Sequence, residues 1–147
     1  MSAATPDGTP AAAPLTPAAL LADFSPPVRA IAERVVALVT AHVPDVEVRA
    51  YPGWRGIGLR DAQAGYFCGV FPRHENGEAG RGECVRVLFE HGAALPDPEG
   101  VLTDGGSQTR WATLRPGAPV PEGALLRLVD AALLHGAARA RGSARRG

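Results

Sequence analysis

The carboxylates that could hold a metal ion gather in one stretch of the chain. Asp97, Glu99 and Asp104 share a long connection, and Glu90 lies near its start. Oxygen ligands suit hard, exchangeable cations, so this stretch is the best candidate for a metal site in the sequence. A solvated acidic loop accounts for the same residues equally well. Clustering of the four carboxylates would favour the metal site.

Aromatic side chains form the second candidate site, because seven of the eight aromatic residues lie between Tyr51 and Trp111. Tyr51, Trp54, Tyr66 and Trp111 could line a pocket for a small apolar or aromatic ligand, since aromatic faces with a few polar tips are typical of ligand clefts. The same residues could instead fill the hydrophobic core. Trp54 follows a Pro-Gly break in the chain, and we expect it to be the one that lies outside the core.

Arg110 is the charged residue that we add to this ligand-binding set. Together with Arg55 it could clamp a carboxylate or a phosphate, because a guanidinium presents pairs of donors in one plane. The clamp requires the two side chains to converge. Two exposed strand arginines that do not meet are the alternative interpretation.

Residues for nucleophilic catalysis are poorly placed in this sequence. A nucleophile would have to be a cysteine or a serine beside a base. Cys68 lies among apolar neighbours, where a thiol is usually inert, and with Cys84 it makes neither metal spacing nor a disulfide framework. The four histidines show no paired spacing typical of zinc. We therefore predict a non-enzymatic protein that binds a ligand or a partner, with no resident cofactor.

The elements that must position these residues follow from hydrophobic spacing and from Pro and Gly. Ser25 is the predicted N-cap of a first helix that ends at Pro44. A final helix is predicted from Glu122 to His135, with Gly136 as its stop. Alternation of apolar and polar residues predicts the strands between these helices, at residues 46–51, 56–59, 66–71, 84–89 and 109–114.

This order predicts an α+β domain. Its antiparallel sheet has about five strands in a meander, flanked by an N-terminal and a C-terminal helix packed on one face. The strand at residues 66–71 is apolar on both faces and should be central. Gly56 and Gly58 share one face of their strand, which indicates a bulge or a close approach to the backbone. The free face would carry aromatic residues and glycines and could form a shallow groove.

The overall composition limits the classes of partner that the protein is expected to bind. A chain of 147 residues fits one domain, which we assign to residues 16–136, between a disordered tail at 1–15 and a frayed, Arg-rich tail at 137–147. Fifteen basic and fifteen acidic residues cancel, which argues against nucleic acid and anionic membranes as partners. The sequence has no apparent signal segment or membrane span, so we expect a cytoplasmic protein. Unpaired sheet edges leave a monomer or a homodimer open.

Four short strings stand out, at residues 51–54, 65–68, 89–92 and 95–100, together with Arg110 followed by Leu114 and Arg115. In combination they resemble the YdhG-like family of small bacterial domains. The resemblance covers about residues 24–135. Most of this family has no assigned function, and one branch is described as a frataxin-like iron chaperone. The resemblance implies a curved antiparallel sheet, and it adds an iron-binding chaperone as the alternative function, with Glu90, Asp97, Glu99 and Asp104 as the metal-binding set.

Overall fold

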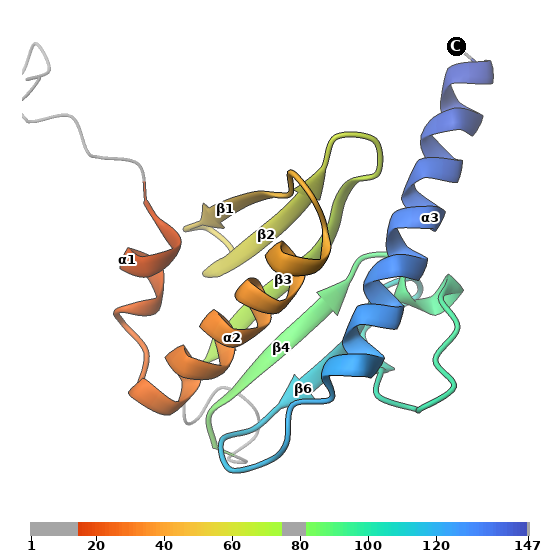
Figure 1. The fold of residues 1–147 in the computed structure, drawn as a ribbon. Helices are drawn as coiled ribbons and strands as arrows, with labels where there is room; N and C mark the ends of the chain where they lie inside the picture. The colour runs from red at the N-terminus through yellow and green to blue at the C-terminus, as the bar shows by residue number, and fades with distance from the viewer. Residues whose placement is uncertain (1–14, 75–81, 147) are drawn as a thin grey trace, which may run out of the picture.

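The computed structural model describes residues 15–74 and 82–146, and its helices lie on one side of a curved antiparallel sheet (Figure 1). The α+β class is therefore as predicted. In chain order the elements are α1 (Pro17–Leu21), α2 (Pro26–His42), β1 (Glu47–Tyr51), β2 (Gly56–Asp61), β3 (Gly65–Arg73), β4 (Cys84–Phe89), the 3₁₀ turn η1 (Gly92–Ala94), β5 (Thr103–Asp104), β6 (Arg110–Leu114) and α3 (Glu122–Arg146).

The sheet has the strand order β1-β2-β3-β4-β6-β5, with every neighbouring pair antiparallel. Five of these strands form the predicted meander. The two-residue strand β5 was not predicted, and it adds to the edge of the sheet beside β6 by pairing Thr103 with Trp111. Strand β3 lies between β2 and β4, in the interior position that its two-sided apolar pattern predicted. The register shifts once between β2 and β3, at Leu59 and Arg60.

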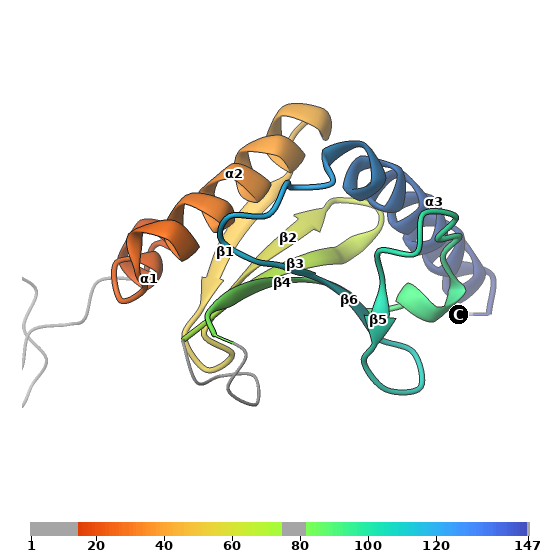
Figure 2. The ribbon, with the colours of Figure 1, turned by 90° about the horizontal axis from the view of Figure 1, so that it is seen from below.

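Both long helices cover the same face of the sheet, as Figure 2 shows. Helix α2 begins where predicted, with Ser25 at the N-cap position and Pro26 and Pro27 in its first turn. The Ser25 hydroxyl does not cap the helix, because it donates a hydrogen bond to the carboxylate of Glu83 at the start of β4. This bond ties the beginning of α2 to the sheet.

The hydrophobic core lies between this face of the sheet and the helices. Phe89, Ile57 and Leu59 from the strands and Leu125 from α3 are its largest fully buried side chains. Most of the remaining core side chains are aliphatic, alternating along β4 and β6 and recurring at helical spacing in α2 and α3, and Phe24 and Phe67 add two further aromatic rings. The core therefore joins two layers, the sheet and the pair of helices α2 and α3.

Helix α3 is longer than the sequence predicted, and the prediction that it ends at Gly136 was wrong. It continues to Arg146 through the stretch that we assigned to a frayed tail. Alanine and arginine, which dominate that stretch, are among the best helix formers. Gly136 is not a cap. A side chain there would meet the backbone oxygen of Ala64 at 2.8 Å, so the glycine lets the helix pack closely on the β2–β3 turn.

The predicted tail at residues 1–15 lies outside the described residues, apart from Leu15. Within the described parts of the chain, none of the helices combines the length and the apolar character needed to cross a membrane.

Candidate functional site

The face of the sheet opposite α2 and α3, called the open face below, is made by alternate residues of each strand. Directly paired residues point to the same side of a sheet, and Gly58 pairs with Gly69 while Leu88 pairs with Trp111. Three of the four predicted aromatic ligand residues lie on this face rather than in the core cluster. The open face gathers Tyr51, Gly56, Gly58, Tyr66, Gly69, Phe71, Arg86, Leu88 and Trp111.

Glycines allow the aromatic rings of the open face to lie directly on the backbone. A Cβ atom at Gly58 would stand 2.5 Å from the ring of Tyr51 and 3.0 Å from the ring of Tyr66. A Cβ atom at Gly69 would meet the hydroxyl of Tyr66 at 2.1 Å and the ring of Phe71 at 2.4 Å. The close approach predicted from the glycine pattern is therefore present, and the approaching groups are the protein's own rings.

Trp54 stands on the turn between β1 and β2, and it lies outside the core as expected. Its side chain is 57% exposed. Its ring stacks on Tyr51 at a centroid distance of 4.7 Å and meets Tyr66 edge-on at 6.1 Å. The three rings therefore form one continuous group, called the aromatic patch below, in which Trp54 presents the face that reaches furthest into solvent.

Trp111 lies farther along the open face, with the Arg86 guanidinium 4.5 Å from its ring centroid, a cation–π distance. Arg110 and Arg55 do not converge. The Arg110 guanidinium donates to the backbone oxygens of Gly106 and Thr109, where it braces the loop before β6. The Arg55 guanidinium lies over the ring of Phe24, at the far edge of the sheet. The proposed two-arginine clamp is therefore not formed.

Two titratable groups of β3 are held in their neutral forms. Burial, and secondarily the charges of Cys68, Glu90 and Tyr51, raise the pKa of the Tyr66 phenol well above its usual range, so it keeps its proton near neutral pH. Burial raises the pKa of the Cys68 thiol to about 12. Cys68 and Cys84 are both buried, and neither forms a disulfide. A fully buried thiol that holds its proton is a poor nucleophile.

Two of the four carboxylates predicted to bind metal, Asp97 and Glu99, have separate local roles. Asp97 accepts backbone N–H bonds from Val101 and Leu102, at 3.0 and 2.9 Å, and so shapes its own loop. Glu99 forms an ion pair with Arg127 of α3. Glu90 is exposed at the end of β4. Asp104 lies in β5, and its side chain is outside the described part of the structure. Among the side chains that the structure describes, no group of three from Asp, Glu, His or Cys is arranged to hold a metal ion.

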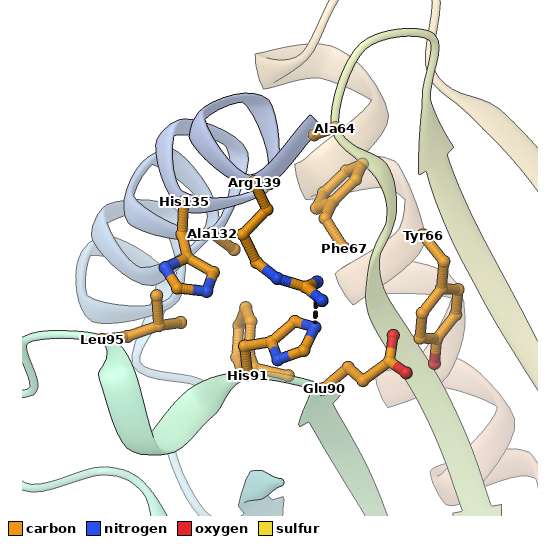
Figure 3. A pocket seen from close by; sticks show the side chains of 11 residues that line it. Ala64, Tyr66, Phe67, Glu90, His91, Leu95, Ala132, His135 and Arg139 are labelled. Atoms are coloured by element: carbon orange, nitrogen blue, oxygen red, sulfur yellow. Dashed lines mark hydrogen bonds between the residues drawn. The ribbon is translucent and has the colours of Figure 1, made fainter. Parts of the chain in front are cut away.

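A pocket that the sequence did not reveal lies between α3 and the connection after β4 (Figure 3). Its small inner part has a volume of about 30 Å³, room for one or two water molecules. His91, His135 and Arg139 line both this inner pocket and an adjacent open groove of about 370 Å³. The Arg139 guanidinium donates a hydrogen bond to Nε2 of His91, and the two imidazole rings lie 5.3 Å apart.

Sequence reasoning missed this pocket because it ended α3 too early. His135 and Arg139 are four residues apart on one helix, a spacing that puts them on the same face. With the helix stopped at Gly136, Arg139 fell in the predicted tail and His91 was an isolated loop histidine. The run of helix-forming Ala and Arg residues at 137–141, with no proline after Gly136, was the signal that could have extended the helix.

Comparisons with known proteins give no match among protein-family models, curated proteins or solved structures.

Proposed function

We propose that this protein is a non-enzymatic binding module that docks a protein partner on the open face of its sheet. The observation that carries the proposal is Trp54, which is 57% exposed although its ring is fixed by stacking on Tyr51. Trp and Tyr are enriched among the residues that contribute most to binding at protein interfaces. A rigid tryptophan standing in water is therefore a suitable anchor for a partner.

The preformed shape of the aromatic patch supports the same function. Tyr51 and Tyr66 rest on Gly58, so these rings have little freedom left to lose when a partner binds. Binding costs less entropy when the contact residues are already ordered. A layer of rings packed on the backbone offers contacts from one side only, whereas small-molecule sites enclose most of their ligand. These features favour a protein surface over a small molecule as the partner.

Binding rather than catalysis is supported by the state of the buried thiols. Cys68 is the residue of β3 with nucleophilic chemistry, and its pKa of about 12 keeps it protonated and unreactive. We propose that the module works in a reducing cytoplasm, in which cysteines that are not joined in a disulfide persist as thiols. A monomer and a homodimer both fit the proposal, since the partner could be a second copy of the chain.

The frataxin-like iron chaperone stays the alternative prediction, together with the YdhG-like resemblance that suggested it. Asp97 and Glu99 weigh against it, because each already has a local partner. Metal ligands of a chaperone should be exposed and free to converge. We therefore rank partner binding first.

Site-specific photocrosslinking in the native cells tests the proposal. A benzoylphenylalanine probe replaces Trp54 in one variant and Leu134 in the other, and Leu134 is a matched control because it is 73% exposed on α3, away from the aromatic patch. We expect a discrete crosslinked product from position 54 only. The crosslinked protein is then purified, and its affinity is measured for the natural chain and for Trp54→Ala.

The substitution should weaken binding by about 2 kcal/mol or more, as expected for an anchor residue. Identical products from both probe positions would contradict the proposal, and so would unchanged affinity of Trp54→Ala for the purified partner. A crosslink to a second copy of this chain would identify the partner as the protein itself.

A further inference from the structure

We propose that the groove between η1 and α3 binds a small organic anion, whose carboxylate or phosphate group is held by Arg139 together with His91 and His135. This site is independent of the partner-binding proposal, although Tyr66 contributes its ring to both regions. Figure 3 shows the three basic side chains pointing toward one another from two elements that are far apart in the sequence.

Close packing of α3 against the β2–β3 turn brings the three basic side chains together. Gly136 lies directly against Ala64, where even a Cβ atom would come within 2.7 Å of the Ala64 side chain. Ala132 is buried one turn earlier. Small residues on this side let the helix approach the β2–β3 turn closely. His135 and Arg139 are thereby carried over the connection that bears His91.

The charges at the site favour an anion. The Arg139 guanidinium keeps its charge at any physiological pH. It donates a hydrogen bond to the ring of His91, and within the described residues it has no carboxylate at ion-pairing distance. A guanidinium has five N–H donors, so most of its donor capacity stays available to a carboxylate or phosphate. Glu90 is the acidic neighbour, and Figure 3 shows its carboxylate lying on the side of Tyr66.

The ionisation state of His91 also favours an anion at this site. Burial lowers the pKa of His91, and the charges of Arg139 and His135 lower it further, while the charge of Glu90 and a hydrogen bond with the Gln108 side chain oppose them. Near neutral pH the ring is therefore uncharged and able to accept the Arg139 hydrogen bond. A bound anion would reverse this balance, because a negative charge favours the imidazolium form. Anion binding should then be coupled to proton uptake by His91.

The shape of the groove accommodates more than a simple ion. Its volume of about 370 Å³ is within the range of pockets that bind small molecules. Ala93 and Ala94 of η1 form an apolar wall, and Gln108 adds an amide beside the basic residues. The charged end of a ligand would meet Arg139 and the two histidines, and its carbon skeleton would lie against the alanines.

The test follows the ring C–H signals of the four histidines by NMR in the full chain, while sodium phosphate or sodium acetate is added at constant ionic strength. We expect saturable shifts of the His91 and His135 signals and an upward shift of the His91 pKa. His42, which pairs with Asp130 between α2 and α3, should not respond. The anion that binds more tightly distinguishes phosphate from carboxylate recognition.

Two arginine variants distinguish a specific anion site from a general electrostatic effect of the positive charge on α3. Arg139→Gln should weaken binding about tenfold to a hundredfold, because charge-assisted hydrogen bonds to the anion are lost. Arg141→Gln removes the same charge from the same helix, two residues away and outside the pocket lining, and should leave the affinity unchanged.

Arg139→Lys keeps the charge but loses the planar donor pair, so it should bind with intermediate affinity and serves if Arg139→Gln lowers the melting temperature. Shifts that grow linearly, without saturation, with both anions would overturn the proposal. Equal losses in Arg139→Gln and Arg141→Gln would overturn it as well.

Discussion

The two faces of the sheet bury their strands by different means. On one face, α2 and α3 cover side chains such as Val70 and Val87, which are 0% and 1% exposed. None of the helices in the described part of the chain covers the open face, yet Phe71 of the same central strand is only 8% exposed. Its ring lies over Gly56 and Gly69, within the layer of rings that also includes Tyr51 and Tyr66.

The difference shows that burial of a strand does not require a second layer of secondary structure. Rings that lie flat on glycines exclude water from the backbone and from one another, at the cost of leaving the outer ring, Trp54, in solvent. The covered face is therefore suited to stability, and the open face combines some stability with an exposed anchor. Substitutions on opposite faces of the same strand can test this division.

The largest effect is expected from Phe89 at the end of β4, a fully buried member of the core. Phe89→Ala should lower the free energy of unfolding by about 3 to 5 kcal/mol, because it removes buried surface and leaves a cavity. Urea unfolding followed by circular dichroism measures this change. Leu88→Ala is the control, since Leu88 is the adjacent, half-buried residue on the open face and should cost clearly less. Equal losses would contradict the division between the faces.

The ring layer is tested at Gly58, which lies beneath Tyr51 and Tyr66. Gly58→Ala should cost about 1 to 3 kcal/mol, because the added methyl group pushes two packed rings off the backbone. Gly53→Ala, in the β1–β2 turn, has no atom within 4 Å of the new Cβ and should be nearly neutral. If Gly58→Ala is as stable as the natural chain, the rings of the open face are not tightly packed on the strand.

The contact between α3 and the β2–β3 turn is tested at Gly136. Glycine is about 1 kcal/mol less favourable than alanine inside a helix, so an uncrowded Gly136→Ala would be stabilising. We expect a net loss of about 1 kcal/mol instead, because the new methyl group would meet Ala64 backbone atoms that cannot move aside easily. Gly123→Ala, near the start of the same helix, meets only the tip of Arg127 and should be neutral or stabilising. A stabilised Gly136→Ala would show that the helix does not depend on this close approach.

The sequence was sufficient for the fold class and for the meander because these depend on local signals. Alternation along β4 and β6 and the Ser25-Pro26-Pro27 string each specify an element without reference to the rest of the chain. Strand β5 could not be predicted, since two residues carry too short a pattern. The end of α3 was misjudged because glycine is as compatible with close packing as with a helix stop.

The candidate sites could not be predicted in the same way, because they depend on three-dimensional contacts that no local sequence pattern specifies. The exposure of Trp54 followed from its position after a Pro-Gly break, but its stacking on Tyr51 depends on the curl of the β1–β2 turn. Arg139 and His91 are 48 residues apart, and only the docking of α3 brings them into contact. The acidic loop had the right residue types for a metal site, and the structure gave Asp97 a backbone partner instead.

Substitution of Trp54 should separate function from stability on the open face. Trp54→Ala should change the free energy of unfolding by no more than about 0.5 kcal/mol, because a mostly exposed side chain loses little burial on removal. Tyr51→Ala should cost more, since its ring also covers Gly58. Thermal unfolding of both variants checks the order. A larger loss of unfolding free energy for Trp54→Ala would show that the tryptophan stabilises the sheet rather than serving as an exposed contact for a partner.

The smallest effect is expected from His91, which should make stability depend on pH in the acid range. This residue lines the pocket beside α3, so its effect can be compared with that of a residue on the open face. The pKa of His91 is lower in the folded chain than its ordinary value of 6.5, so the folded state binds fewer protons than the unfolded state below that pH. Stability should therefore fall as the pH drops below about 6.5 and level off once the folded-state pKa is passed. Urea midpoints between pH 8 and pH 5 should show this decline in the natural chain and a weaker one in His91→Gln.

Tyr66 should act at the opposite end of the pH scale. Burial raises its pKa in the folded chain above the ordinary value of 10.0, so the folded state holds a proton that the unfolded state loses. Stability should then decline as the pH rises above about 10, and Tyr66→Phe should reduce that decline. If His91→Gln and Tyr66→Phe altered the pH profile in the same range, the pocket and the open face would share one titrating unit. Separate ranges would show that His91 and Tyr66 titrate independently, His91 on the acid side and Tyr66 on the alkaline side.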